Sequence, residues 1–198
     1  MDNITITQIH PTDSKLRKEW EALLAKEGIR KDLNIEYTIG LLDEKGRLLA
    51  TGSCFRNSLR CLAVDNEHQG TGLLGQVVSA LLDYQYQRGN THVFLYTKCE
   101  SAMYFQNLGF NEISRVRDKA VFMESTPYGF SRYLKNLQRG HGKQSAIVMN
   151  ANPFTLGHRW LVEKACRESD TVHLFIVSED VSQFPYEVRE KLIREGTA

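Results

Sequence analysis

The residues best suited to chemistry stand together in the segment Thr155-Leu156-Gly157-His158. An apolar run at 146–149 precedes this segment, and apolar residues at helical spacing follow it from Trp160. A strand that ends in a tight loop and continues as a helix points free N–H groups and the positive end of the helix dipole at one place, which suits a phosphate. Gly157 allows close approach to a ligand, and His158 adds a donor that can carry positive charge. Structural β–α turns share this pattern, so a purely structural interpretation stays open.

The longer string around this segment, MNANPFTLGHRWLVEKA at 149–165, resembles a known family. Its part at 152–158 resembles the T/HxGH signature of the nucleotidylyltransferase superfamily, and the whole string is similar to the citrate lyase ligase family. That family has Thr where many relatives carry the first His of the signature, as Thr155 stands here. The resemblance implies an enzyme that uses ATP, Mg²⁺ and acetate. Its product is an acetylated thiol on the phosphoribosyl-dephospho-CoA group of the citrate lyase acyl carrier subunit, with AMP and pyrophosphate released.

The same resemblance suggests which residues form the nucleotide site. Thr155 and His158 are expected to be catalytic, stabilising charge on the α-phosphate. The expected nucleotide-binding residues are Asn150, Asn152, Pro153, Phe154, Gly157 and Arg189. For Arg189, a solvated position on a helix face is the alternative. No protein metal site is expected, because Mg²⁺ commonly enters together with the nucleotide.

A second glycine-containing loop, Gln69-Gly70-Thr71-Gly72-Leu73-Leu74-Gly75, precedes a strong helical pattern. Small residues before a helix make a concave set of N–H groups that binds anions. The loop resembles the Q/R-x-x-G-x-G/A sequence of GNAT acetyltransferases, which holds the pyrophosphate of coenzyme A, so all seven residues are expected to bind CoA or dephospho-CoA. Leu74 departs from the pattern, which has Gly or Ala at this place. An ordinary capped loop is the alternative.

A later segment, 102–110, resembles the "xFYxxLGF" segment of the GNAT fold. In many GNAT enzymes the residue at the place of Tyr104 protonates the leaving thiolate, so Tyr104 joins the expected cofactor site. A Tyr in an apolar stretch also fits a half-buried core position. Acetyl transfer to an amine needs a base, and neither Glu67 nor Glu100 is uniquely placed for that role. His68 fits either an anion contact or a solvated loop.

The elements that position these loops are predicted to form two units of an α/β protein. In the first, hydrophobic periodicity predicts a strand around Ile4 and Ile6, strands at Tyr37–Leu42, Leu48–Cys54, Leu59–Val64 and His92–Thr97, and two more between Phe110 and Glu124. Helices are expected from a cap at Asp13 or Thr12 to about Lys26, at Leu73–Arg88 and at Ser101–Asn107. This order resembles the α+β GNAT fold with its mixed sheet. We expect a GNAT-like domain at 1–125 and a helical connector at 126–144.

The second unit, 145–198, is predicted to be a Rossmann-like parallel α/β unit. Strands are expected at 145–149 and 171–177, and helices at 158–168 and about 187–195. The nearly continuous apolar run at 171–177 fits a strand covered on both faces. A nucleotidylyltransferase sheet needs more strands than these. We therefore expect an incomplete domain and a fragment of a longer enzyme.

Composition excludes several other classes. The chain has 25 Lys+Arg against 24 Asp+Glu, so no strong field directs it to nucleic acid or a membrane surface. It contains neither a membrane-spanning apolar run nor a signal-peptide pattern, which favours a cytoplasmic protein. The cysteines Cys54, Cys61, Cys99 and Cys166 lack zinc-site spacing and are expected to be reduced and buried.

Three functions stay open at this point. The Thr155–His158 segment favours an ATP-dependent ligase. The Gln69–Gly75 loop alone favours an acetyltransferase that uses acetyl-CoA. The missing part of the second sheet favours a non-catalytic module that binds the carrier protein.

Overall fold

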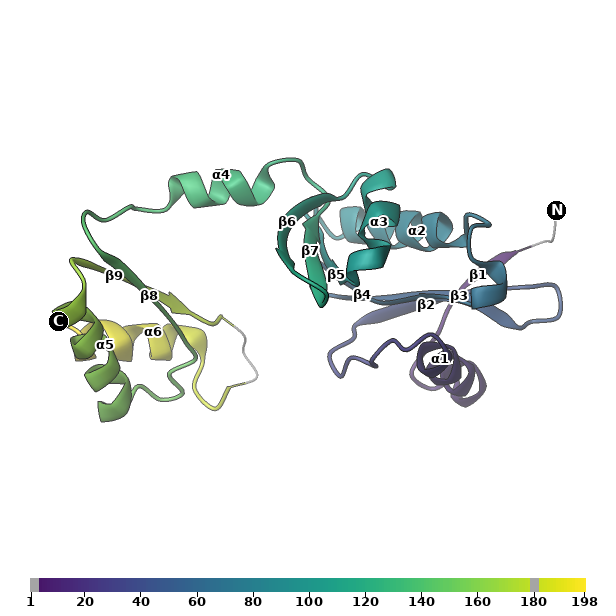
Figure 1. The fold of residues 1–198 in the computed structure, drawn as a ribbon. Helices are drawn as coiled ribbons and strands as arrows, with labels where there is room; N and C mark the ends of the chain where they lie inside the picture. The colour runs from purple at the N-terminus through teal and green to yellow at the C-terminus, as the bar shows by residue number, and fades with distance from the viewer. Residues whose placement is uncertain (1–3, 179–181) are drawn as a thin grey trace. The chain divides into compact units, whose positions relative to one another are not determined.

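The computed structural model describes residues 4–178 and 182–198. The chain divides into two compact units, Met1–Lys135 and Asn136–Ala198, and each has its own sheet (Figure 1). The division falls inside the segment that the sequence predicts to be a connector. No helix in the two described ranges is long and apolar enough to cross a membrane.

The first unit is built on a seven-stranded mixed sheet with the order β1-β2-β3-β4-β5-β7-β6. Its strands are β1 (Thr5–Gln8), β2 (Tyr37–Leu42), β3 (Leu48–Phe55), β4 (Ser58–Val64), β5 (Phe94–Thr97), β6 (Asn111–Val116) and β7 (Ala120–Glu124). Its helices are α1 (Ser14–Lys26), η1 (Asn66–His68), α2 (Leu73–Gln87), η2 (Cys99–Ser101), α3 (Ala102–Asn107) and α4 (Gly129–Asn136). The predicted hairpin, the helices and the mixed sheet are confirmed.

The two long helices of this unit lie on opposite faces of its sheet, as Figure 1 shows. On α1, Trp20, Leu23 and Leu24 pack in one buried cluster. Of the two expected caps, Asp13 and Thr12, it is the Asp13 side chain that caps the helix. On α2, Val77 and Leu81 are fully buried in a second and larger cluster. Burial on both faces fixes the sheet, and with it the loops at its edges.

Strands β4 and β5 form the one parallel pair of this sheet. They pair only at Ser58 with Phe94 and at Leu59 with Leu95, so their later residues are not paired with each other. Ligands of α/β proteins commonly bind beyond the carboxyl ends of parallel strands. The Gln69–Gly75 loop follows β4 at such an end.

The second unit contains β8 (Gln144–Met149), α5 (Leu156–Glu168), β9 (Thr171–Ile176) and α6 (Tyr186–Gly196). The strands are parallel and alternate with the helices along the chain, so the predicted order of strand and helix is confirmed. Met149, Val162 and Ile193 join the two helices to one face of the sheet. Val148 is 72% and Phe175 is 37% exposed. Coverage of the second strand on both faces, expected from its apolar run, is therefore wrong for the described residues.

Candidate functional site

The N-terminus of α2 lies in an open loop with free backbone donors. Gly70 and Gly72 have left-handed φ values of +80° and +86°, and a Cβ built on either would meet nothing within 4 Å. Gly72 provides no side-chain cap, and the first helical hydrogen bond runs from Gln76 N to Gly72 O at 3.2 Å. Within the described residues, the N–H groups of Gly70 through Gly75 donate no hydrogen bond. The loop is therefore equipped to bind an anion.

The other residues of this loop hold it in place. Thr71 Oγ1 donates to His68 O at 2.6 Å, and the Gln69 side chain donates to Glu27 at 3.5 Å. Leu73 is buried and Leu74 packs against the same core, so the departure of Leu74 from the GNAT pattern places no side chain in the open loop. What this loop offers a ligand is mainly its backbone.

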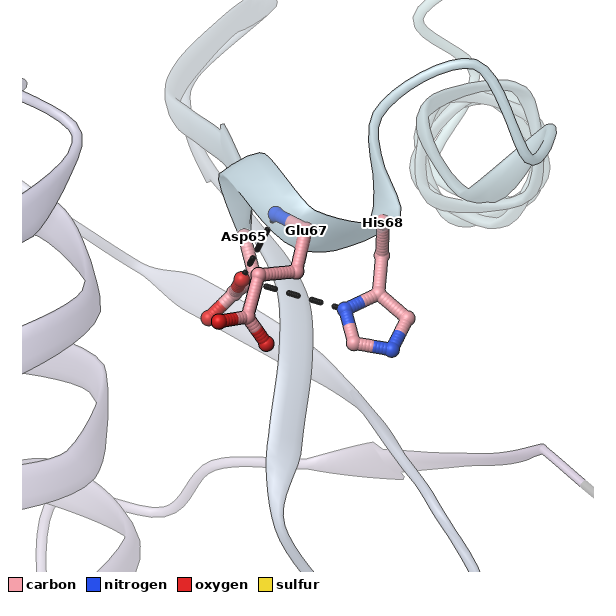
Figure 2. Close-up of side chains that lie close together, drawn as sticks. All are labelled: Asp65, Glu67 and His68. Atoms are coloured by element: carbon pink, nitrogen blue, oxygen red, sulfur yellow. Dashed lines mark hydrogen bonds and ion pairs between the residues drawn. The ribbon is translucent and has the colours of Figure 1, made fainter.

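Just before the loop, Asp65, Glu67 and His68 place potential metal-ligating atoms within 4.8 Å of one another (Figure 2). Asp65 has partners within the chain, since it accepts hydrogen bonds from Lys26 Nζ at 2.9 Å and from Glu67 N at 3.0 Å. The Lys26 hydrogen bond holds the pKa of the Asp65 carboxyl below its usual value. Asp65 Oδ1 lies 3.8 Å from His68 Nδ1. Capping of η1 and the pair with Lys26 account for the position of Asp65.

Tyr104 lies on α3 and is 63% exposed, so the core alternative for this residue is wrong. Phe105 fills the core instead. A Cβ built on Gly75 would lie 3.5 Å from Leu108 Cδ2, which brings the start of α2 close to the end of α3. The two segments that resemble GNAT sequences are thus neighbours in the fold.

The cysteines differ in exposure. Cys54 and Cys61 are buried, as expected, and burial raises the pKa of the Cys54 thiol to about 11. Cys99 is half-buried and Cys166 is exposed, so the expectation of buried thiols is wrong for Cys166. Cys166 lies on α5, one helical turn after Val162.

In the second unit, Thr155 is the N-cap of α5, and His158 turns back toward it. Thr155 N donates to His158 Nδ1 at 3.1 Å, and Thr155 Oγ1 lies 2.8 Å from the same atom. The backbone N–H has a fixed direction whereas a hydroxyl rotates, so Nδ1 is the acceptor and carries no proton. The proton of neutral His158 then lies on Nε2, which makes no hydrogen bond within the described residues. Phe154 stacks on the ring with centroids 5.7 Å apart.

The loop before α5 is held by Ser182 and Phe184, which lie between β9 and α6. Asn150 and Ser182 share side-chain hydrogen bonds of 3.1 and 3.2 Å, and Asn152 Oδ1 accepts from Phe184 N at 2.9 Å. Ser182 was not among the expected site residues. Pro153 is exposed in this loop. Asn150 and Asn152 precede Thr155 and His158 in the same loop, and their side chains bond to Ser182 and Phe184. A shared site of these residues with Ser178 stays a prediction.

Arg189 is 0% exposed, so a solvated position on a helix face is wrong for this residue. Its Nη1 donates to Asn150 O, to Asn150 Oδ1 and to Val177 O, each at 2.8 Å. Its Nε donates to Phe184 O at 2.9 Å. Sequence periodicity gave no sign of these bonds, because they join residues up to 39 positions apart.

The architecture of the first unit is that of the GNAT acetyltransferases. An acetyltransferase of the GNAT family from Staphylococcus aureus Mu50 superposes with a TM-score of 0.51 at 14% identity, covering 62% of this chain and 98% of that one. An aminoglycoside 6'-N-acetyltransferase complexed with coenzyme A gives a TM-score of 0.53 at 12% identity, covering 61% and 95%. At these identities the likeness shows the fold alone.

The sequence comparisons reach beyond the first unit. Residues 144–198 match the family model "Citrate lyase ligase C-terminal domain". The chain is 40% identical over 187 residues to the [citrate [pro-3S]-lyase] ligase of Klebsiella pneumoniae, which covers 93% of this chain and 54% of that protein. It is 36% identical over 200 residues to the ligase of the same name from Escherichia coli K12, covering 99% and 56%.

The chain is therefore a relative of the citrate lyase ligases, as the string at 149–165 indicated. It spans a little over half the length of the curated relatives that it matches.

Proposed function

We propose that the protein acts as an ATP-dependent acid–thiol ligase that activates citrate lyase. Acetate attacks the α-phosphate of ATP, giving acetyl-AMP and pyrophosphate. The thiol of the phosphoribosyl-dephospho-CoA group on the acyl carrier then attacks the acetyl carbon, and AMP leaves. Similarity to curated ligases over nearly the whole chain supports this reaction. The observation in the structure that carries it is the pairing of Thr155 with His158 at the start of α5.

His158 supplies an oriented donor in this proposal. Because Thr155 N–H occupies Nδ1, the Nε2–H bond points away from the cap and is available for a phosphate oxygen. A donor held in place before the reaction stabilises developing charge without reorganisation. Gly157 carries no side chain that would obstruct this approach, and the loop from Asn150 to Phe154 shapes the nucleotide side.

Mg²⁺ enters with ATP in this proposal. The loop at 150–158 offers amide, hydroxyl and imidazole groups and contains no carboxylate. Mg²⁺ prefers oxygen ligands and is often held by substrate phosphates. The ion would neutralise phosphate charge, while the chain binds and orients the nucleotide.

The open loop at the start of α2 would hold the arm of the carrier. Dephospho-CoA keeps a diphosphate, and the N–H groups of Gly70 through Gly75, which have no acceptor among residues 4–178 and 182–198, are suited to it. The GNAT-like unit then presents the carrier thiol rather than using acetyl-CoA. We place this reaction in the cytoplasm, where ATP and reduced thiols occur together.

Acetate-dependent exchange between ATP and labelled pyrophosphate tests the proposed reaction. The ligase is expected to catalyse exchange only when acetate is present, because the first step is reversible. An acetyltransferase would instead consume acetyl-CoA without ATP, and a non-catalytic module would bind the carrier without exchange. Absence of acetate-dependent exchange in folded protein would rule out the ligase reaction for this chain.

A further inference from the structure

We infer that Arg189 is a positioning residue that clamps Asn150, just after β8, to Val177 and Phe184, between β9 and α6, and thereby fixes the orientation of His158. The inference rests on the proposed function for its consequence in catalysis. Its structural part, the clamp, concerns only contacts within the second unit.

The guanidinium group of Arg189 reaches the ends of both parallel strands. Asn150 follows β8 directly and Val177 follows β9 directly, and Nη1 donates to the backbone carbonyls of both at 2.8 Å. Nε reaches Phe184 O, farther along the second loop, at 2.9 Å. A planar group with fixed N–H directions can hold several carbonyls at once, which a lysine ammonium cannot reproduce.

Burial of Arg189 decides how it acts. A side chain that is 0% exposed has no surface to offer a dissolved phosphate. Burying a charged group is costly unless hydrogen bonds compensate, and here the chain supplies them at the place where the two loops meet. Arg189 therefore acts on the site through the loops rather than by touching the nucleotide.

A continuous set of contacts leads from Arg189 to His158. Phe184 accepts from Arg189 through its carbonyl and donates through its N–H to Asn152 Oδ1 at 2.9 Å. Asn152 is two residues from Phe154, whose ring stacks on the imidazole, and three from Thr155, whose N–H binds Nδ1. Loss of the Arg189 hydrogen bonds should therefore let the His158 imidazole, which carries the Nε2–H donor, change its orientation.

The test compares Arg189→Lys and Arg189→Met with Arg194→Met in the whole chain. Arg194 lies on the same helix and is a matched control, because its side chain is 77% exposed and pairs with Glu190. Amide exchange of Phe184 and Thr155 should be roughly tenfold or more faster in both Arg189 variants, since each loses about one hydrogen bond or more of protection. Exchange in β3 of the first unit should be unchanged, and Arg194→Met should resemble the unmodified protein.

A second readout reports on His158 itself. Nitrogen NMR shifts of the His158 ring should show a single tautomer, protonated on Nε2, in the unmodified protein and in Arg194→Met. In Arg189→Lys they should move toward a mixture of tautomers. A generally destabilised but correctly arranged loop would leave these shifts unchanged. If Arg189→Met fails to fold, the Lys variant, which keeps the charge, carries the test.

Kinetics separate the clamp from a direct phosphate contact. In pyrophosphate exchange, Arg189→Lys should lower kcat and leave KM for ATP within about twofold, because orientation rather than ground-state binding is lost. A raised KM with unchanged amide exchange and ring shifts would overturn the inference and make Arg189 a nucleotide ligand. Amide exchange and ring shifts need no turnover. A folded protein that catalyses no pyrophosphate exchange would therefore refute the proposed function. The clamp would still be tested by amide exchange and by the ring shifts.

Discussion

Two strand–loop–helix junctions in this chain are equipped for phosphates in different ways. At the start of α2, Gly72 gives no side-chain cap, and the N–H groups of residues 70–75 donate to no partner in the part of the chain that the structure describes. At the start of α5, Thr155 N–H donates to His158 Nδ1, which leaves Nε2–H of the imidazole as the donor that faces away from the cap. In the proposed function the first junction would bind a diphosphate through backbone N–H groups, which requires that no side chain stand in the way. The second depends on one side chain and on the loops that orient it.

The sheets that carry the two junctions differ as well. The first junction leads into a helix buried against a seven-stranded sheet. The second lies on two parallel strands whose one face exposes Val148 and Phe175. Parallel sheets are ordinarily covered on both faces, so the second unit has less burial to hold its loops. The hydrogen bond that the Asn152 side chain accepts and those that Arg189 donates replace part of that support.

The largest expected effect comes from removing the outward donor of the second junction. His158→Ala should lower acetate-dependent pyrophosphate exchange by about 10²–10³-fold, the usual loss for one preorganised donor. His173→Ala is the control, because His173 lies within β9 and bonds only to Gln144 among the described residues. Equal exchange rates for His158→Ala and the unmodified enzyme would remove His158 from the mechanism.

Gly72→Glu tests the first junction separately. A negative side chain would stand where a diphosphate is expected, and like charges repel strongly in such a concave site. Acetyl transfer to the carrier should fall by roughly tenfold or more, a loss of at least 1.4 kcal/mol of binding, while pyrophosphate exchange stays unchanged. Gly46→Glu is a matched control, since Gly46 also has a left-handed φ, +74°, and open space around it. Normal carrier acetylation by folded Gly72→Glu protein would return the loop to a structural role.

The sequence predicted the elements and the two junctions well, because both rest on local patterns. Periodicity placed α2 and α5 within about two residues of their observed bounds, and the start of α1 was predicted from the capping residues Thr12 and Asp13 before an apolar helix. Tyr104 and Arg189 could not be placed in this way. Whether a residue on a helix faces solvent depends on what packs there, and the carbonyls that surround Arg189 come from distant parts of the chain.

The open face of β9 was missed for a related reason. An apolar run resembles a strand covered on both faces, although the run itself does not specify what covers it. Here α5 and α6 join one hydrophobic cluster on the same face, through Val162 and Ile193. The relatives are almost twice as long as the matched region, so the longer proteins have further chain available to cover the other face.

A moderate effect is expected where α2 packs on β3. A Cβ at Gly52 would lie 2.6 Å from Val77 Cγ1 and 2.7 Å from Leu81 Cδ1, both in the buried core. Gly52→Ala should therefore lower the free energy of unfolding by about 1–3 kcal/mol through overpacking. Gly75→Ala is the control, because its Cβ would make an ordinary 3.5 Å contact. Urea denaturation followed by tryptophan fluorescence measures both. Equal stability of the two variants would mean that α2 adjusts easily.

The smallest expected effect is at the open face of the second sheet. Val→Thr changes shape little but adds a hydroxyl, which is costly only where water is excluded. At Val162, which is 7% exposed, the change should cost about 1–3 kcal/mol. At Val148, which is 72% exposed, it should stay within about 0.5 kcal/mol. Amide exchange of β8 and β9 measures both variants in the same unit. If Val148→Thr destabilises the unit as much as Val162→Thr, the face is covered in solution. Sedimentation would then show whether a second copy of the chain covers it.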